Sequence, residues 1–171
     1  MSLNQLEQWL GDHAQTDLPP VESWHPEHCG DMDMVIRRDG SWWHEGTEMR
    51  RKSLVRLFSR ILRLDGEDYV LVTPAEKIRI QVEDTPFVAI LGEWKDGVLS
   101  VMTQTGDLLE VGEQHPMTLQ PLDGEMLPVV EVRRGLKARI GRNLYYQLAE
   151  IATELDGQYV ITSHGKPWPV A

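Results

Sequence analysis

A segment made of an amphipathic helix, a turn and a strand occurs twice in this chain, the second time 90 residues after the first. At this offset the apolar positions coincide: Leu54 with Leu144, Phe58 with Leu148, Ile61 with Ile151, and Tyr69 with Tyr159. A helix with one apolar face must bury that face against a sheet or another helix. The repeat therefore predicts two related small α+β domains. The alternative is that any such helix followed by Asp-Gly and a strand would align equally well by chance.

The two repeated helices are predicted over residues 51–63 and 142–155, where apolar side chains recur every three or four positions. An Asp-Gly pair ends each helix, and a strand follows each pair. A further short helix is expected at the N-terminus, because Ser2 and Gln5 have the spacing of a capping box.

Asp39-Gly40 predicts a tight hairpin, because a two-residue type I′ turn needs positive φ at both of its positions. Such a turn would pair Arg37 with Trp42. Successive side chains of a strand point to opposite faces. Trp43 is therefore expected in the core, and Arg37, Trp42 and His44 are expected together on the other face.

Polar residues followed by a proline at 83–86 indicate a domain boundary. After it the pattern is almost wholly β until the second helix, with short strands separated by Gly, Pro and Asp-Gly signals. We predict an N-terminal helix and irregular arm over residues 1–31 and a first α+β domain over 32–84. Residues 85–171 are predicted to form a second β-rich domain that contains the second helix.

Composition limits the environment and the partners of the chain. The 171 residues carry a formal net charge of −10, which disfavours general attraction to nucleic acid or to anionic membranes. The one cysteine, Cys29, excludes an intrachain disulfide and fits a reducing compartment. No apolar run approaches the roughly 20 residues of a membrane span, and the N-terminus lacks the pattern of a secretion signal. We expect a cytoplasmic protein.

Several motifs in the first 80 residues are familiar: Pro19-Pro20-Val21, Trp24-His25-Pro26, Asp39-Gly40-Ser41-Trp42 with His44 and Gly46, and Leu71–Lys77. With them the chain resembles the bacterial family of domain of unknown function 1285 over nearly its whole length. The resemblance implies two related β-rich domains, the second similar to a pleckstrin-homology-like barrel. It also implies a groove between the domains as a site for a nucleotide or nucleic-acid-like ligand, with no established activity.

Basic residues gather in two short stretches that contain no Asp or Glu, although the chain is acidic. Six of the 17 Lys and Arg residues lie in 50–63 and five lie in 133–142. Arginine forks and helix N-termini both suit phosphate groups. Arg50 and Arg51 near one helix start, with Arg139 and Arg142 near the other, are therefore candidate ligand contacts. For Arg56, Arg60 and Arg63 an ordinary solvated face is favoured.

Two further groups are candidates for ligand contacts. The ring of Trp42 beside Arg37 and His44 can stack a planar ligand, although for Trp42 a packed position, covered by the N-terminal arm or the other domain, is slightly favoured. Glu76 and Lys77 follow a strand in a loop that contains a proline, and they can form either an acid/base pair or a polar latch, of which the latch is favoured.

Metal and enzyme signatures are weak. His25, His28 and Cys29 lie close together, but a structural zinc site needs four ligands that usually come from two separated pairs. Sequence signatures of nucleotide-binding glycine loops, serine hydrolases and zinc proteases are missing. No metal, no cofactor and no catalytic residue is expected.

The function predicted from these observations is a binding or regulatory protein. It would take an anionic, phosphate-bearing ligand, nucleotide-like or nucleic-acid-like, in the cleft between the two domains. The alternative is a protein–protein interaction module without a small-molecule ligand. A hydrolase or nuclease that uses Glu76, His44 and a metal is the weakest hypothesis.

Overall fold

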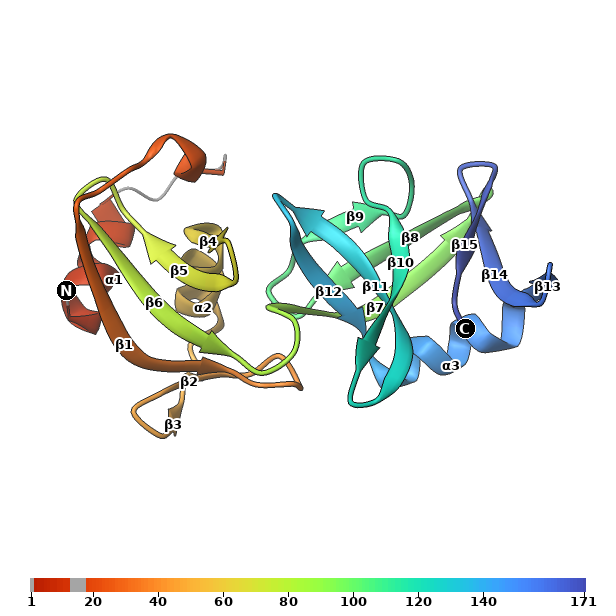
Figure 1. Ribbon diagram of the computed structural model, residues 1–171, viewed down its shortest axis with the longest axis horizontal. Coiled ribbons are helices and arrows are strands. Elements are labelled where there is room, and N and C mark those ends of the chain that lie inside the picture. Colours follow the sequence, from red (N-terminus) through yellow and green to blue (C-terminus); the bar gives the residue numbers. More distant parts are fainter. Residues whose placement is uncertain (1, 13–17) are drawn as a thin grey trace. The chain divides into compact units, whose positions relative to one another are not determined.

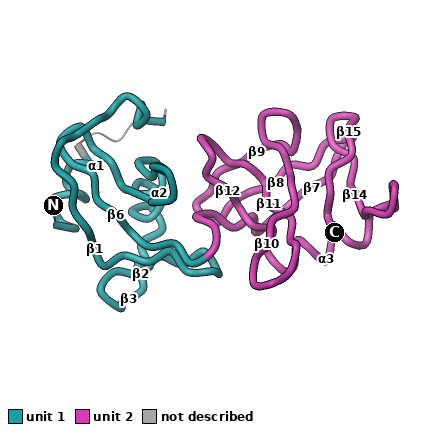
Figure 2. Tube along the Cα trace, in the orientation of Figure 1, with its two compact units in different colours: residues 1–83 teal, residues 84–171 magenta. Residues whose placement is uncertain are grey.

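The computed structural model describes residues 2–12 and 18–171 (Figure 1). The chain divides into two compact units, unit 1 over residues 1–83 and unit 2 over residues 84–171 (Figure 2). Each unit has its own sheet and its own buried apolar side chains, and each is described by itself. No helix in the described part of the chain is long and apolar enough to cross a membrane.

Unit 1 packs helices on one face of a six-stranded sheet. Its elements are α1 (Leu3–Asp12), a 3-10 turn (Val21–Ser23), β1 (His28–Ile36), β2 (Trp42–His44), β3 (Thr47–Glu48), α2 (Lys52–Arg60), β4 (Leu62–Asp65), β5 (Asp68–Val72) and β6 (Glu76–Val82). The strand order is β3-β2-β1-β6-β5-β4, and only β1 and β6 are parallel. Alternation along β6 buries Ile78 and Ile80 and leaves Arg79 exposed. Along β6 the core face is therefore apolar and the outer face polar, whereas on β5 the outer-face residues Val70 and Val72 are buried as well.

Unit 2 contains two sheets and one helix. Its elements are β7 (Phe87–Lys95), β8 (Val98–Thr103), β9 (Leu108–Glu110), β10 (Met117–Leu122), β11 (Glu125–Arg133), β12 (Leu136–Ile140), α3 (Arg142–Ile151), β13 (Thr153–Leu155), β14 (Gln158–Ser163) and β15 (Lys166–Pro169). The six-stranded sheet has the order β10-β11-β12-β7-β8-β9, and β13-β14-β15 form a separate three-stranded sheet. Leu144 and Leu148 are the buried residues of α3.

The predicted two-domain architecture with a duplicated segment is confirmed at this level: both units are rich in β structure, and each carries a helix followed by a hairpin. Both predicted helices were too long, however. α2 ends at Arg60 and α3 ends at Ile151, and in each case the next few residues form a strand. Asp65-Gly66 and Asp156-Gly157 belong to the turns of the β4–β5 and β13–β14 hairpins rather than to helix ends.

The copies also differ. In unit 1 the three strands after the helix join the main sheet through the parallel pairing of β6 with β1, whereas in unit 2 they form a sheet of their own.

The N-terminal prediction is confirmed in part. The backbone N–H of Gln5 donates to Ser2 Oγ at 3.2 Å, and the backbone N–H of Ser2 donates to Gln5 Oε1 at 3.0 Å, so the capping box forms. The arm does not extend to residue 31, because β1 begins at His28. Residues 28–31 are polar, and they become a strand by pairing with β6, which local sequence does not reveal. Residues 13–17 of the predicted arm lie outside the described residues.

The predicted register of the first hairpin was wrong by one residue. Ile36 pairs with Trp42 and Val35 with Trp43, and the loop closes where the backbone N–H of Arg37 donates to the carbonyl of Ser41 at 2.8 Å. Only Gly40 in this loop has positive φ, at 89°, so the turn is a three-residue loop rather than type I′. Because register has a period of two, the shift exchanges the faces of Trp42 and Trp43.

Candidate functional site

The outer face of the unit 1 sheet carries only some of the predicted ligand contacts of this unit, Arg37 and Lys77 among them. The one-residue shift places Trp43 on this face and Trp42 in the core, where Trp42 is 1% exposed and packs against Phe58 with ring centres 6.4 Å apart. Trp42 is thus a core residue, and its proposed contact with a ligand is wrong. His44 pairs with Met34 on the core face, so it is separated from Arg37 as well.

Arg37 and Trp43 form a stacked pair on the outer face. The guanidinium carbon of Arg37 lies 3.8 Å from the centre of the Trp43 ring, a cation–π contact. The indole N–H of Trp43 donates to Ser41 Oγ at 2.8 Å, which fixes the ring. Ser41 in turn donates from its hydroxyl to Asp39 and holds the pKa of that carboxyl below its ordinary value. The hairpin loop therefore orients the aromatic side chain.

Basic side chains continue from this stacked pair toward the start of α2. Glu48 lies opposite Trp43 in the β2–β3 ladder, and its carboxylate is 3.6 Å from Nε of Arg50. Arg50 is 86% exposed, and the next cation, Arg51, pairs at 2.7 Å with Glu7 of α1. Lys52 begins the helix and is also exposed. We call this set the basic-aromatic surface: Arg37, Trp43, Arg50, Arg51 and Lys52.

A second polar group on the outer face is centred on Asp65. The two oxygens of Asp65 accept from Nε and Nη2 of Arg63 at 2.7 and 3.0 Å, and Nζ of Lys77 lies 3.1 Å away. These cations hold the pKa of the Asp65 carboxyl below its ordinary value, the bonds from Arg63 being the largest cause. Lys77 is therefore paired with Asp65, whereas Glu76 lies near His28, and the predicted latch stays a prediction.

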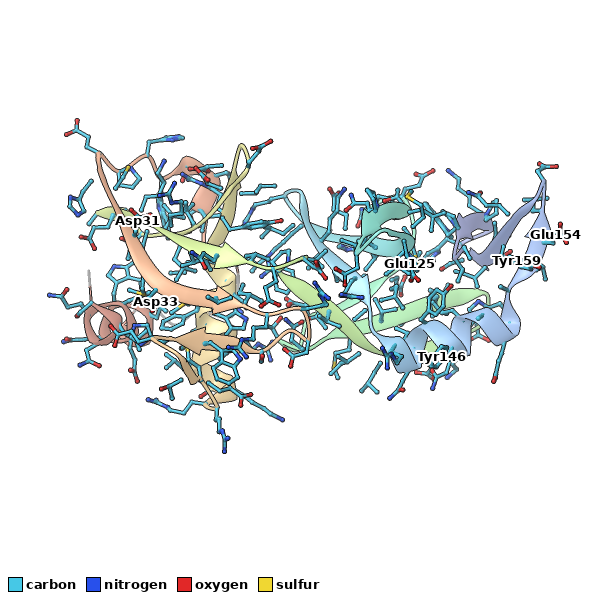
Figure 3. The ribbon with its side chains drawn as sticks, turned by 60° about the horizontal axis from the view of Figure 1, so that its bottom comes forward. Asp31, Asp33, Glu125, Tyr146, Glu154 and Tyr159 are labelled. Carbon is cyan, nitrogen blue, oxygen red and sulfur yellow. The ribbon has the colours of Figure 1, made fainter. Side chains whose placement is uncertain are left out.

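Two small cavities, of about 330 and 360 Å³, meet at Asp65 and Lys77. The first is also lined by Asp31, labelled in Figure 3, whose carboxylate accepts from Nε of Arg79 at 2.7 Å. Glu76 faces His28 on β1, at 3.4 Å between Oε1 and Nε2. Every cation named in this area has a carboxylate neighbour, so an anion would have to displace one.

Arg63 has a structural task that the sequence pattern did not show. Predicted on the solvated face of a helix, it lies on β4 with its side chain only 12% exposed. Its Nη1 donates to the carbonyls of Val21 and Trp24 at 2.6 and 2.7 Å. Arg63 thereby ties the segment before β1 to the sheet, which local helical periodicity cannot predict.

The predicted contacts in unit 2 have different environments. Arg139 is 18% exposed and pairs with Asp84 at 2.7 Å, so its guanidinium is committed to a carboxylate within the same unit. Arg142 is exposed as the first residue of α3. The stretch 133–142, read as a charge run, contains β12, in which Leu136, Ala138 and Ile140 are buried between its basic residues.

A cavity in unit 2 was not predicted from the sequence. It measures about 690 Å³ and lies between β9, the turn that follows it and the β14–β15 hairpin. Its polar side chains include Glu110, Glu113, His115, His164 and Lys166. Within residues 2–12 and 18–171 no group of three or more His, Cys, Asp or Glu side chains is placed to hold a metal ion.

Comparisons with known proteins agree with this division of the chain. Residues 19–85 match the family model described as "Domain of unknown function (DUF1285), N-terminal domain". Residues 86–170 match "Protein of unknown function (DUF1285), C-terminal domain". No curated protein matches the sequence.

Two solved structures are similar to the chain. A DUF1285 family protein from Silicibacter pomeroyi DSS-3 is 39% identical, with a TM-score of 0.84, over 94% of this chain and 92% of that one. A DUF1285 family protein from Shewanella baltica OS155 is 29% identical, with a TM-score of 0.57, over 70% of this chain and 91% of that one.

Proposed function

This chain belongs to the DUF1285 family, and we propose that it is a cytoplasmic binding or regulatory protein that takes a phosphate-bearing, nucleotide-like ligand on the basic-aromatic surface of unit 1. The observation that carries the proposal is the stacking of Arg37 on the half-buried Trp43 ring at 3.8 Å, with the exposed Arg50 linked to the same strand pair through Glu48. All ligand contacts proposed here lie in unit 1, so Arg139 and Arg142 of unit 2 are no longer among them. Trp43 takes the stacking role that was predicted for Trp42.

The chemistry of the surface suits the two parts of a nucleotide. A guanidinium stacked on an indole extends a flat surface on which a base can lie. The exposed guanidinium groups of Arg50 and Arg51 match phosphate oxygens in pairs. The carboxylates nearby are those of Asp39, close to Arg37, and of Glu48 and Glu7, whose pairs with Arg50 and Arg51 are partly exposed. Exposed pairs contribute only about 0–1 kcal/mol, so a phosphate can replace them at little cost.

The proposal also keeps the expected relation of unit 2 to pleckstrin-homology-like barrels. Its support is the six-stranded sheet with irregular pairing between Ala89 and Leu91 and between Glu131 and Arg133, since bulges bend a sheet toward closure. The binding role proposed for unit 1 does not depend on this relation.

Thermal unfolding with a ligand panel tests the proposal. ATP, pyrophosphate and adenosine are compared on the unmodified protein, and a ligand at 100 times its Kd should add about 2.7 kcal/mol of stability. We expect ATP to stabilise most, because it has both a base and phosphates. Arg50→Gln with Arg51→Gln should weaken the binding of both ATP and pyrophosphate. Trp43→Leu should weaken the binding of ATP and leave the binding of pyrophosphate unchanged.

The matched control is Lys95→Gln with Lys137→Gln, which removes the same charge from unit 2. If this pair weakens ATP binding as much as the arginine pair does, the attraction is general and the proposed surface is wrong. A melting temperature unmoved by all three ligands would also overturn the proposal.

A further inference from the structure

The unit 2 cavity has walls that are held in place without a ligand. Ser163 is fully buried; its hydroxyl donates to the carbonyl of Val111 at 2.7 Å and accepts from the backbone N–H of Leu99 at 2.9 Å. The indole N–H of Trp168 donates to the Ser163 carbonyl at 3.0 Å. The β14–β15 hairpin is thereby fixed against β8 and the end of β9, so a ligand would not have to order it.

Close packing fixes the opposite wall. A Cβ added to Gly112 would lie 3.1 Å from Cδ2 of His164, so the turn after β9 rests directly on the imidazole ring. Nε2 of the same ring lies 2.8 Å from Glu110. Lys166, two residues further along the hairpin, contacts the carboxylate of Glu113. Two pairs of polar side chains, His164 with Glu110 and Lys166 with Glu113, therefore line the cavity.

The polar groups of the cavity are mainly hydrogen-bond acceptors. Nδ1 of His115 lies 2.9 Å from the carbonyl of Glu131, and because a carbonyl only accepts, Nδ1 must carry a proton. The other ring nitrogen of neutral His115 is then an acceptor. Glu110 and Glu113 add two carboxylates, against one permanent cation, Lys166. The contact with Lys166 also lowers the pKa of Glu113, which keeps that carboxylate charged.

Apolar side chains supply the rest of the lining. Leu108 is 76% exposed on β9, and Leu109 and the half-buried ring of Trp168 also line the cavity. A volume of about 690 Å³ lies within the range that holds small organic ligands. A ligand that fits this lining has an apolar body and a positively charged group that donates hydrogen bonds.

We propose that the unit 2 cavity binds an organic cation, an ammonium or guanidinium group on a carbon chain, in contact with Glu110 and Glu113. An incoming cation can take the place of Lys166 or His164 at a carboxylate. Together with Lys166 it then balances the two negative charges of Glu110 and Glu113. An anion would have to take Lys166 from Glu113 and then lie beside two carboxylates. This site is independent of the anion surface proposed for unit 1.

The cation can belong to a free amine or to an Arg or Lys side chain of a peptide. β9 is the last strand of its sheet. Residues Asp107 and Val111 exchange backbone hydrogen bonds with β8, so by alternation the backbone groups of Leu108 and Glu110 face the open edge. An extended peptide can add there and place a basic side chain in the cavity.

Calorimetric titration of the full chain tests the proposal. The probes are agmatine, N-acetyl-arginine amide, and its neutral analogue N-acetyl-citrulline amide, with glutarate as an anion. We expect the two guanidinium compounds to bind and the citrulline compound and glutarate not to bind. Glu110→Gln with Glu113→Gln should weaken guanidinium binding by at least about tenfold, equivalent to 1.4 kcal/mol.

The control variant carries Glu125→Gln with Glu154→Gln, two exposed acids elsewhere in unit 2 (Figure 3). The proposal would be overturned if the control variant lost as much binding as the cavity variant, or if neither guanidinium compound bound. It would also be overturned if the citrulline compound bound as well as the guanidinium compounds, or if glutarate bound in their place. Melting temperatures of both variants show whether unit 2 is still folded; if the cavity pair is unfolded, Glu110→Gln alone replaces it. An extended peptide with one central arginine separates the two sources: tighter binding than agmatine indicates a peptide, and equal binding indicates a free amine.

Discussion

In each unit one partly buried charged side chain bonds to several other groups. Arg63 is the example in unit 1, because one guanidinium binds the Asp65 carboxylate and two backbone carbonyls of the preceding segment. Hydrogen bonds to charged groups contribute about 1.5–3 kcal/mol, more than bonds between neutral groups. By contrast, Arg56 on α2 is exposed. The two arginines carry the same charge and should differ strongly in what their removal does.

Arg63→Gln should lower the free energy of unfolding of unit 1 by about 2–4 kcal/mol, because two carbonyls and a carboxylate lose their charged donor. The backbone amide of Trp24, which donates to Val21, should also exchange hydrogen faster. Arg56→Gln should stay within about 0.5 kcal/mol of the unmodified protein. Urea unfolding and hydrogen exchange measure both effects, and equal stability of the two variants would contradict this role.

Asp107 is the corresponding carboxylate in unit 2. Burial would raise its pKa, but Arg133 at 2.9 Å and hydrogen bonds from Thr105 and Thr103 outweigh that effect and hold the pKa below its ordinary value. A carboxyl with a lowered pKa in the folded state stabilises the protein at neutral pH. That stability is lost as the pH falls below about 4 and through the folded-state pKa.

Asp107→Asn should therefore destabilise unit 2 by about 2–4 kcal/mol at neutral pH and should flatten the loss of stability below about pH 4. Asp156→Asn, in an exposed turn, is the matched control. It should leave the acid limb, the fall of the unfolding free energy below about pH 4, unchanged. Urea unfolding at a series of pH values measures both. An acid limb as steep in Asp107→Asn as in the unmodified protein would show that other carboxylates cause it.

Trp42 and Trp43 show the limit of sequence reasoning at this scale. That the two neighbouring rings lie on opposite faces followed from strand alternation and is confirmed. Which ring lies inside depended on the length of the loop, and Asp-Gly is compatible with a two-residue or a three-residue loop. The φ of Asp39 decides between them, and nothing local in the sequence fixes that angle.

At the scale of elements, the ends of helices and the short strands could not be predicted from local sequence either. The apolar stripe of α2 was predicted correctly, whereas in α3 only Leu144 and Leu148 are buried and Ile151 is exposed. The stripe of α2 continues without interruption into the buried Leu62 of β4. Helical spacing and strand alternation agree over such a short overlap, so the end of the helix is set by pairing with β5. β12 was not predicted. Its three apolar side chains alternate with basic ones and lie between further basic residues, so the stretch was interpreted as a charge run.

Gly141 allows α3 to begin against β7. Its backbone N–H donates to the carbonyl of Ala89 at 2.9 Å, and a Cβ at this position would lie 2.9 Å from that same oxygen. Because the obstacle is backbone, Gly141→Ala should displace the helix start and cost about 1–3 kcal/mol.

The control for this substitution is Gly11→Ala in α1, where nothing lies within 4 Å of the added Cβ. It should stabilise the protein by about 0.5–1 kcal/mol, the usual gain of alanine over glycine in a helix. Thermal unfolding measures both. A stabilising Gly141→Ala would show that the contact between α3 and β7 is looser than the structure indicates.

The whole molecule combines an acidic net charge with an uneven distribution of it. The chain carries −10, yet the basic-aromatic surface of unit 1 has four cations in five residues, whereas the unit 2 cavity has more carboxylates than permanent cations. We therefore propose two sites of opposite preference, one in each unit. Each ligand should stabilise mainly the unit that binds it, according to its concentration relative to its Kd.

The indole N–H resonances of the six tryptophans, followed by NMR during a titration with ATP, test this account most directly. The Trp43 resonance, assigned with Trp43→Phe, should move and saturate, because its N–H is bonded to Ser41 beside Arg37. The Trp168 resonance should stay in place with ATP and move with N-acetyl-arginine amide. A Trp43 resonance that does not move at any ATP concentration would contradict the central claim.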